Sequence, residues 1–163
     1  MANNVYRGSD GSISLATDAG AEGERAAAIG ETYSLTPIGR VTDVTVHVQT
    51  DLKPFHELGQ RLATELRPGN VNVFGRIKRA FINGALLKLM LGEAADSRPA
   101  GTFVSPAFNL SLRLQNPSLP DSSATVTVMG VKIEDWVYTL PEDDFVMEEV
   151  RFRALSVTVT ETP

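Results

Sequence analysis

The sequence predicts a mainly β protein: a two-sheet β-sandwich or barrel that carries one short α-helix. Three observations support this fold class. Several segments alternate apolar and polar residues at period two, the pattern of half-buried strands. One short segment is instead apolar on nearly every side and made of strong helix formers. The chain of 163 residues is 42% hydrophobic and 21% charged, enough for one core, so residues 1–163 are expected to form a single domain.

The first 37 residues differ from the rest because they are rich in Gly, Ala, Ser and Thr. Residues 12–18 are a candidate strand. Residues 19–31 contain helix formers but also three glycines, so a loop with at most two helical turns is expected there. Residues 1–37 are therefore predicted to be a low-complexity N-terminal arm or loop region, either disordered or used for contact.

Regular strands begin after this region. Residues 40–51 place valines on one face and polar side chains on the other, and residues 71–82 alternate in a similar way. Between them we expect a short strand near residues 61–66 and a turn at residues 68–70, Pro-Gly-Asn. Arg79 interrupts the alternation of the second strand.

The next segment, NGALLKLMLG, is the most distinctive of the chain. We predict a helix from about Gly84 to Leu91, N-capped by Asn83 and ended by Gly92. A helix that is apolar on nearly all sides must be covered on all sides. Either the sheets of its own chain or a neighbouring subunit would supply that cover.

Three strands are predicted in the remainder. Residues 106–117 alternate leucines with polar side chains, residues 124–141 form a long strand with a bulge at Gly130, and residues 145–162 form a final long strand. The last two exceed the usual strand length and are joined by an acidic turn. They are therefore expected to make a hairpin that projects beyond the body.

Composition excludes several classes of protein. A net charge of −5 and no cysteine argue against a basic nucleic-acid glove, a disulfide framework, a thiolate nucleophile and a cysteine-based zinc site. The longest apolar run, residues 85–91, is interrupted by a lysine and is far too short to span a bilayer. No membrane-spanning segment is predicted.

No motif in the sequence predicts catalysis, a metal or a cofactor. His47 and His56 lack the partners of a catalytic triad, and the acidic groups lack the spacing of a calcium loop. Paired carboxylates around Glu134 leave a hydrolase as a minor alternative. The main alternative is a β-sandwich module that binds carbohydrate or another ligand on Trp136 and Tyr138.

Charge is divided along the chain. Residues 51–100 carry eight Lys or Arg and five Asp or Glu, whereas residues 120–163 carry three and nine. Such a division favours docking of a basic part of one copy on an acidic part of the next. Arg76, Lys78 and Arg79 are accordingly better explained as a subunit contact than as a nucleic-acid patch.

One long stretch resembles a known family. The segments PFHELGQRL, ELRPGNVNVFGRIKRAFINGALLKLMLG, VTVMGVKIEDW and EVRFRALSVTV, spread between about Gly39 and Thr160, resemble tail tube proteins of contractile-tailed bacteriophages and, more distantly, the tubes of contractile injection systems. The resemblance implies a structural subunit of the virion, assembled in the host cytoplasm. Hexameric rings would stack inside a sheath, and the genome would pass through the lumen without specific binding. Tail sheath, baseplate and tail terminator proteins would be its partners.

The resemblance and the residue patterns together give two sets of candidate residues. The subunit-interface candidates are Arg76, Lys78, Arg79, Asn83, Leu86, Leu87, Met90, Glu142, Asp143 and Asp144. The lumen candidates are polar side chains on two predicted strands: Asn109, Ser111, Gln115, Thr125 and Thr127. The sequence leaves open whether the chain builds the main tube or a specialised ring at one of its ends.

Overall fold

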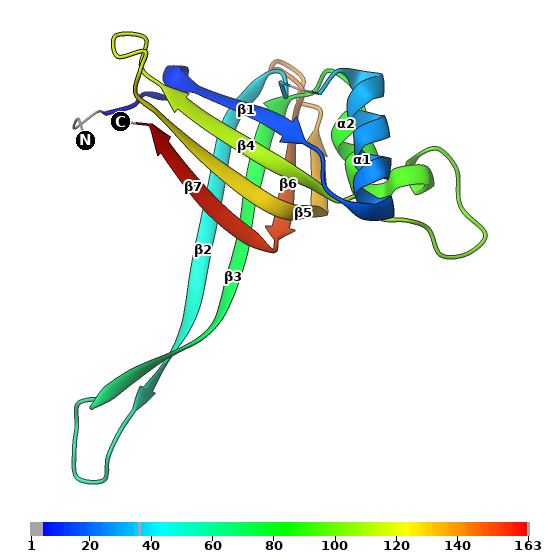
Figure 1. The fold of residues 1–163 in the computed structure, drawn as a ribbon. Coiled ribbons are helices and arrows are strands. Elements are labelled where there is room, and N and C mark those ends of the chain that lie inside the picture. The colour runs from blue at the N-terminus through cyan, green and yellow to red at the C-terminus, as the bar shows by residue number, and fades with distance from the viewer. Residues whose placement is uncertain (1–4, 36, 163) are drawn as a thin grey trace.

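Within the described residues 5–35 and 37–162, the computed structural model has seven strands and two α-helices (Figure 1). In chain order they are β1 Gly11–Ala16, α1 Gly20–Tyr33, β2 Val41–Phe55, β3 Glu65–Ala80, α2 Ala85–Leu91, β4 Phe108–Gln115, β5 Ser123–Thr139, β6 Met147–Ala154 and β7 Ser156–Thr162. Two short 3-10 turns, Gly8–Asp10 and Gly92–Ala95, precede β1 and follow α2. The mainly β prediction is confirmed, with one α-helix more than expected.

The strands form two antiparallel sheets that share β5. Sheet A has the order β1-β4-β5-β7, and sheet B has the order β2-β3-β6-β5. The first half of β5 pairs in sheet A and the second half, from Lys132, pairs in sheet B. Gly130 lies at the bend with a φ of +66°, and a Cβ there would lie 2.6 Å from the Leu155 side chain. The predicted irregularity at Gly130 is confirmed, and glycine is needed for it.

The single final strand predicted over residues 145–162 is wrong, because the segment divides into β6 and β7. Leu155 lies between them, and its amide donates to the Met129 carbonyl at 2.9 Å, beside the Gly130 bend. The chain therefore crosses between the two sheets twice, once within β5 at Gly130 and once between β6 and β7 at Leu155, and the two crossings lie side by side. Inward-facing positions change there from even-numbered (Val150, Phe152) to odd-numbered (Val157).

The N-terminal prediction also requires correction, since residues 20–33 form a 14-residue helix instead of a loop. Two of the glycines are needed within α1, because neighbouring residues pack so closely against them that a side chain would not fit. A Cβ at Gly23 would lie 2.0 Å from the Asp18 carbonyl oxygen, and one at Gly30 would lie 2.9 Å from the Leu15 side chain. The candidate strand is confirmed as β1. Residues 1–4 and 36 of the predicted arm lie outside the described residues.

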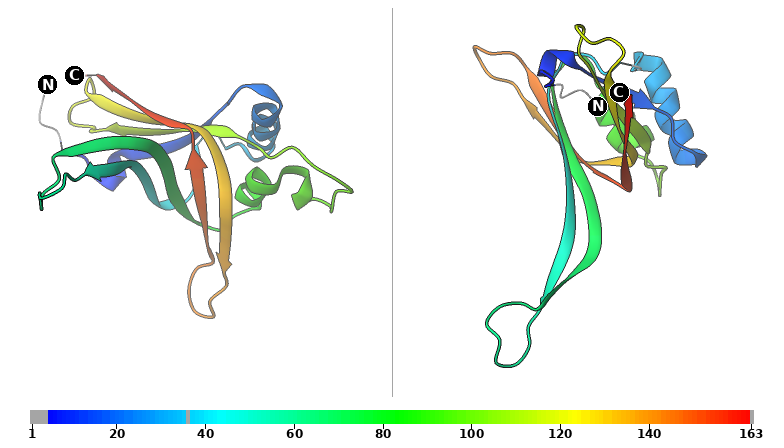
Figure 2. Two further views of the ribbon diagram at one scale, coloured as in Figure 1. Left: turned by 90° about the horizontal axis from the view of Figure 1, so that it is seen from below. Right: turned by 60° about the vertical axis from the view of Figure 1, so that its left-hand side comes forward.

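The core lies between the two sheets and beneath the two helices, which cover one end of the sandwich (Figures 1 and 2). The predicted helix is confirmed as α2. Asn83 Oδ1 accepts a hydrogen bond from the Ala85 amide at 3.1 Å, although Gly84 holds the N-cap position, and Gly92 ends the helix with a φ of +61°. The side chains of Ala85, Leu86 and Leu89 are buried within the chain, whereas Leu87 and Met90 are half-buried. The chain itself therefore covers about half of this helix.

The connection between β2 and β3 differs most from the prediction. No separate strand forms at residues 61–66, because β3 begins only at Glu65, and no turn forms at residues 68–70, because β3 continues through them and pairs with β2 as far as the Phe55–Glu65 pair. The irregular Pro-Gly-Asn sequence is accommodated by a register shift between Thr50 and Leu52. The longest projection of the molecule is thus the β2–β3 hairpin, while the β5–β6 hairpin projects less far (Figures 1 and 2). No helix in the described part of the chain is long and apolar enough to cross a membrane.

Candidate assembly surface

The folded chain exposes far more surface than a compact monomer of its mass. Its accessible surface is 10890 Å², whereas the size scaling of monomeric proteins gives about 7,900 Å² for 17.6 kDa. The excess is roughly 3,000 Å², which is the scale of an obligate subunit interface. Many large apolar side chains are also exposed, and they gather in particular parts of the fold.

The largest contribution comes from the part of the β2–β3 hairpin that extends beyond the body, residues 50–72, which we call the β2–β3 extension. From residue 72 outward, β3 pairs only with β2, because its pairing with β6 ends at Val73. Every residue from 47 to 72 is exposed. The exposed large apolar side chains of the extension are Leu52, Phe55, Leu58, Leu62, Leu66 and Val71.

The extension has one apolar face that continues the inner face of sheet B. Directly opposed residues share a face in an antiparallel pair, and the opposed pairs include Leu52 with Pro68 and Pro54 with Leu66. The same face of β2 carries Val44 and Val46, which pack against the core. An isolated two-stranded ribbon is marginal in water at best, so this face requires a covering surface from elsewhere.

The sandwich is also open at the corner between β2 and sheet A, which we call the open corner. A groove of about 490 Å³ lies there. On the inner face of sheet A, Val159 is paired with Val126 yet is 61% exposed. Inward-facing apolar residues are thus left partly uncovered where the two sheets diverge. The apolar lining of the groove includes Val41, Val44, Val46, Leu112, Leu114 and Val126.

The outer face of sheet B is covered with paired charges. Arg76 contacts Asp43 at 3.3 Å and Glu149 at 3.8 Å. Arg151 lies 3.8 Å from Asp135, and Arg153 lies 2.8 Å from Glu134. Lys78 is exposed on this face, as predicted from the alternation. The paired charges give the face a high density of charged groups but little net charge.

The outer face of sheet A is rich in hydroxyl groups. The structure brings the predicted lumen residues together on this face, with Ser111 opposite Thr127 and Thr125 opposite Arg113. Thr127 in turn lies opposite Thr158 of β7. Two of the candidates have internal partners. The Asn109 side chain donates to the Thr17 carbonyl and accepts from the Gly130 amide, both at 3.0 Å, and Gln115 donates to the Pro120 carbonyl.

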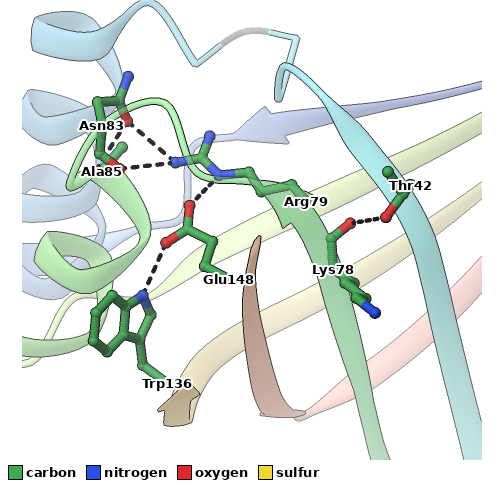
Figure 3. Close-up of polar contacts among 7 residues, drawn as sticks. All are labelled: Thr42, Lys78, Arg79, Asn83, Ala85, Trp136 and Glu148. Carbon is green, nitrogen blue, oxygen red and sulfur yellow. Dashed lines mark hydrogen bonds and ion pairs between the residues drawn. The ribbon is translucent and has the colours of Figure 1, made fainter. Parts of the chain in front are cut away.

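Arg79 does not lie on the surface, contrary to the prediction. It is fully buried in an ion pair with Glu148, which is also buried (Figure 3). The other carboxylate oxygen of Glu148 accepts a hydrogen bond from Trp136 Nε1 at 2.9 Å, and Arg79 Nη2 donates to Asn83 Oδ1 at 3.1 Å. Arg79 and Leu86 therefore offer no side-chain surface to a neighbour in this conformation. A buried charge must be paired. Because Glu148 supplies the partner, Arg79 can occupy an inward-facing position of β3.

The other interface candidates are accessible. Glu142, Asp143 and Asp144 are exposed at the tip of the β5–β6 hairpin. They are flanked by two strongly exposed apolar residues, Leu140 and Phe145. A hairpin tip that combines carboxylates with exposed apolar side chains has the mixed character of an interface.

The described residues do not form a recognisable catalytic or metal site. No group of three or more potential metal ligands occurs among them. Glu134, Asp135 and Glu149 are each paired with an arginine. Trp136 and Tyr138 stack on each other, with ring centroids 5.5 Å apart, and the Trp136 indole is bonded to Glu148. The ligand-binding alternative is therefore not favoured, since its two rings and its polar group are already engaged.

One titratable group on the helical side has a shifted pKa. Lys88 of α2 lies 2.8 Å from an Asp96 carboxylate oxygen and 5.6 Å from the centre of the Tyr33 ring. The hydrogen bond to Asp96, followed by the one to Tyr33, raises the pKa of Lys88 above its usual value. This contact joins α1 to α2 and its following turn.

No protein-family model matches the sequence, and comparison with curated proteins finds no significant match. Solved structures do match. A chain from the extended sheath–tube complex of PVC, an extracellular contractile injection system, superposes with a TM-score of 0.64 over 97% of this chain and 93% of that chain, at 10% identity. The SPP1 tail tube gives 0.58 over 95% of this chain and 78% of that chain, at 11% identity. The chain has the fold of a tail tube subunit.

The same fold occurs in a component of the end of a tube. The tube-terminating cap of the anti-feeding prophage superposes with a TM-score of 0.64 over 100% of this chain and 95% of that chain, at 9% identity. The predicted tail-tube-like architecture is thus confirmed over nearly the whole chain. The region that the resemblance did not cover is part of the shared fold within its described residues, 5–35, 37 and 38.

Proposed function

We propose that this protein is a structural subunit of a tail tube. Hexameric rings stack into a hollow conduit for the delivery of a genome, inside the tail of a virion or a related contractile particle. Its partners are further copies of itself together with sheath, baseplate and terminator proteins, the kinds of assembly in which proteins of this fold are found. The subunits are made in the host cytoplasm and have no catalytic role.

One observation carries this proposal: the chain is folded but incomplete. About 3,000 Å² of excess surface, an apolar extension without a cover and an open corner of the sandwich are together unsuitable for a monomer. A module that binds a small ligand would instead need a closed pocket with a few converging polar groups. The tail tube fold and the exposed apolar surface both point to self-assembly.

We assign the main contact between rings to the extension of one copy and the open corner of the next. The two surfaces lie at opposite ends of β2, since residues 41–44 and Val46 line the groove and Asp51–Phe55 belong to the extension. A contact between opposite ends of identical molecules is head-to-tail and propagates into a filament. Arg76 is already paired within the chain, so apolar surface rather than the charge division drives this contact.

We assign the wall of the lumen to the outer face of sheet B. That face continues onto the polar face of the extension, so it would be uninterrupted from ring to ring. Six four-stranded sheets with strands about 4.8 Å apart would enclose a ring roughly 115 Å around and about 37 Å across. Its arginines are largely neutralised by carboxylates, which limits their attraction to the phosphates of DNA. The hydroxyl face of sheet A, with the five residues predicted from the sequence, is the competing candidate.

Filament formation and crosslinking test the assembly. Purified protein is expected to form rings or filaments on the order of 100 Å wide, as six packed domains would give. Because the chain has no cysteine, disulfides in a Leu66→Cys/Leu114→Cys variant can involve only these two positions, and the single variants Leu66→Cys and Leu114→Cys reveal any pairing of like positions as dimers. Leu66 is too far from Leu114 within one chain to form a disulfide, so oxidation should give a ladder of covalent multimers.

A matched control is Leu66→Cys/Thr127→Cys, which places the second thiol on the outer face of sheet A. It should assemble normally but give no ladder. Filaments whose Leu66 thiol crosslinks only to Thr127 would reject the assigned contact and keep the tube. A protein that remains monomeric at every concentration would reject the tube itself.

Labelling of single cysteines distinguishes the two lumen candidates. Tubes of Thr45→Cys and of Thr158→Cys are first modified with biotin-maleimide, which is small enough to enter the lumen, and then incubated with streptavidin. If sheet B lines the lumen, both tubes take up biotin, but only Thr158→Cys tubes become decorated along their outside. Decoration of Thr45→Cys tubes alone would assign the lumen to sheet A.

A further inference from the structure

The buried charges at the start of α2 have no place in the contacts proposed so far. Arg79 of β3, Glu148 of β6, Trp136 of β5 and Asn83 form one network, which we call the buried lock (Figure 3). It joins three strands of sheet B to Asn83, two residues before the first residue of α2. Arg79 Nη2 also donates to the Asn83 carbonyl at 3.4 Å.

Asn83 connects this network directly to the helix. Its Oδ1 accepts from Arg79 Nη2 and also from the Ala85 amide, both at 3.1 Å. The helix has seven residues, and its N-cap residue, Gly84, has no side chain that could cap it. A helix this short has little stability of its own, so its direction depends on Asn83 and on the packing of Leu86 and Leu89.

The buried lock is expected to contribute little net free energy to folding. Both charges are removed from water, and Arg79 Nη1 is buried without a hydrogen-bond partner among the described residues. Replacement of a buried ion pair by well-packed apolar residues is frequently neutral or stabilising, whereas removal of one partner is strongly destabilising. The best-attested use of such a pair is to select one arrangement over others.

We propose that Arg79 and Glu148 are positioning residues that fix the orientation of α2 on sheet B, and that tube assembly requires this orientation rather than the stability of the pair. The proposal rests on the proposed tube function, because Leu87 and Met90 on the half-buried side of α2 are candidate contacts with a neighbour. A change in the direction of α2 would move these two side chains while the core remained filled. Phe81, Tyr138 and Trp136, whose rings are in contact, cover the same region of sheet B.

The test compares three variants with the wild type. Arg79→Met/Glu148→Leu removes both charges and keeps apolar volume, Arg79→Met leaves the Glu148 carboxylate unpaired, and Ile77→Val trims the neighbouring core without touching the lock. Thermal unfolding, filament formation and hydrogen exchange of the α2 amides are measured for each. Trp136 is the only tryptophan, so its single indole N–H resonance in the NMR spectrum reports on the lock alone.

The double variant should unfold near the wild-type temperature, show a shifted indole resonance and faster exchange in α2, and need at least about tenfold more protein to form filaments. Arg79→Met alone should lose most of its thermal stability. Ile77→Val should melt slightly earlier and assemble normally. Together these results would separate orientation from stability.

Two results would overturn the proposal. A double variant that assembles like the wild type would show that α2 needs no lock, and one that unfolds would show that the pair acts mainly through stability. A wild type that never assembles would count against the tube itself. The α2 exchange rates of the monomers would then still decide whether the lock orients the helix, because unchanged rates in the double variant would reject that role.

Discussion

The body of the molecule and the β2–β3 extension both place apolar side chains on one face of their strands, but only the body buries them. In the body, inward-facing apolar side chains from both sheets and both helices bury one another. In the extension, the apolar residues are just as regularly placed, yet not one of residues 47–72 is buried. The comparison teaches that the same strand can be a core element at one end and an unpaired contact surface at the other, with β2 and β3 serving as both.

Removal of the extension should separate the two regions most completely. Thr50 and Val71 are opposite each other, so residues 51–70 can be replaced by Asn-Gly, a favoured two-residue hairpin turn. The body should retain its thermal unfolding temperature, because no buried side chain is removed. Filaments should be absent by negative-stain microscopy at any concentration. A shortened chain that still forms tubes would show that the body alone carries the contacts.

A pair of identical substitutions sharpens the contrast. Leu89→Ala, at a fully buried position of α2, should lower the free energy of unfolding by about 2–5 kcal/mol. Leu66→Ala, at a 60% exposed position of the extension, should change it by less than about 0.5 kcal/mol. Chemical denaturation measures both. Leu66→Ala should nevertheless raise the protein concentration required for filament formation, although its monomer is as stable as the wild type.

A smaller effect is expected where the two regions join. A Cβ at Gly75 would lie 2.1 Å from the Thr45 carbonyl oxygen and 2.6 Å from the Phe152 ring. Gly75→Ala should therefore lower the free energy of unfolding by about 1–3 kcal/mol through overpacking. Gly101→Ala is the control, because a Cβ there meets no atom within 4 Å. Equal unfolding midpoints for the two variants would contradict the packing described for sheet B.

The same comparison explains how much of the fold the sequence predicts. Where side chains are buried on one face only, alternation identifies the strands, as in β4 and the first half of β5. In the extension, Pro68-Gly69-Asn70 has the composition of a turn. It is nevertheless part of β3, because β3 pairs there with β2, where Pro68 lies opposite Leu52, sixteen residues earlier in the chain. The alternation does continue through Leu66 and Pro68, and this is the signal that identifies the long strand.

Three other elements show why tertiary packing defeats local patterns. The glycines of α1 indicate a loop until Asp18 and Leu15 are known to pack against them. The break between β6 and β7 is visible in the sequence only as the change from even-numbered to odd-numbered apolar positions at Leu155. Arg79 resembles a surface charge because nothing in the sequence places Glu148, 69 residues later, within reach. Among the interface candidates, the three acidic residues of the β5–β6 tip are exposed as a contact would require, whereas Arg79 is buried in the lock.

The smallest expected effect lies in the body, at the contact between its two helices. The pKa of Lys88 is raised in the folded protein, chiefly by the hydrogen bond to Asp96, so the protonated lysine stabilises the fold. That contribution is fully present below the unfolded-state pKa of about 10.5 and is lost as the pH rises through the folded-state pKa. Lys88→Met should therefore differ from the wild type in unfolding temperature at pH 8 and should approach it as the pH rises through the folded-state pKa of Lys88. Lys53→Met, on the extension, is the control and should follow the wild type at every pH, because the extension contributes no buried contact to the body. If both variants track the wild type across the range, the contacts of Lys88 with Tyr33 and Asp96 do not stabilise the packing of the two helices. If Lys53→Met alone departs from it, the extension is tied to the body more closely than its exposure indicates.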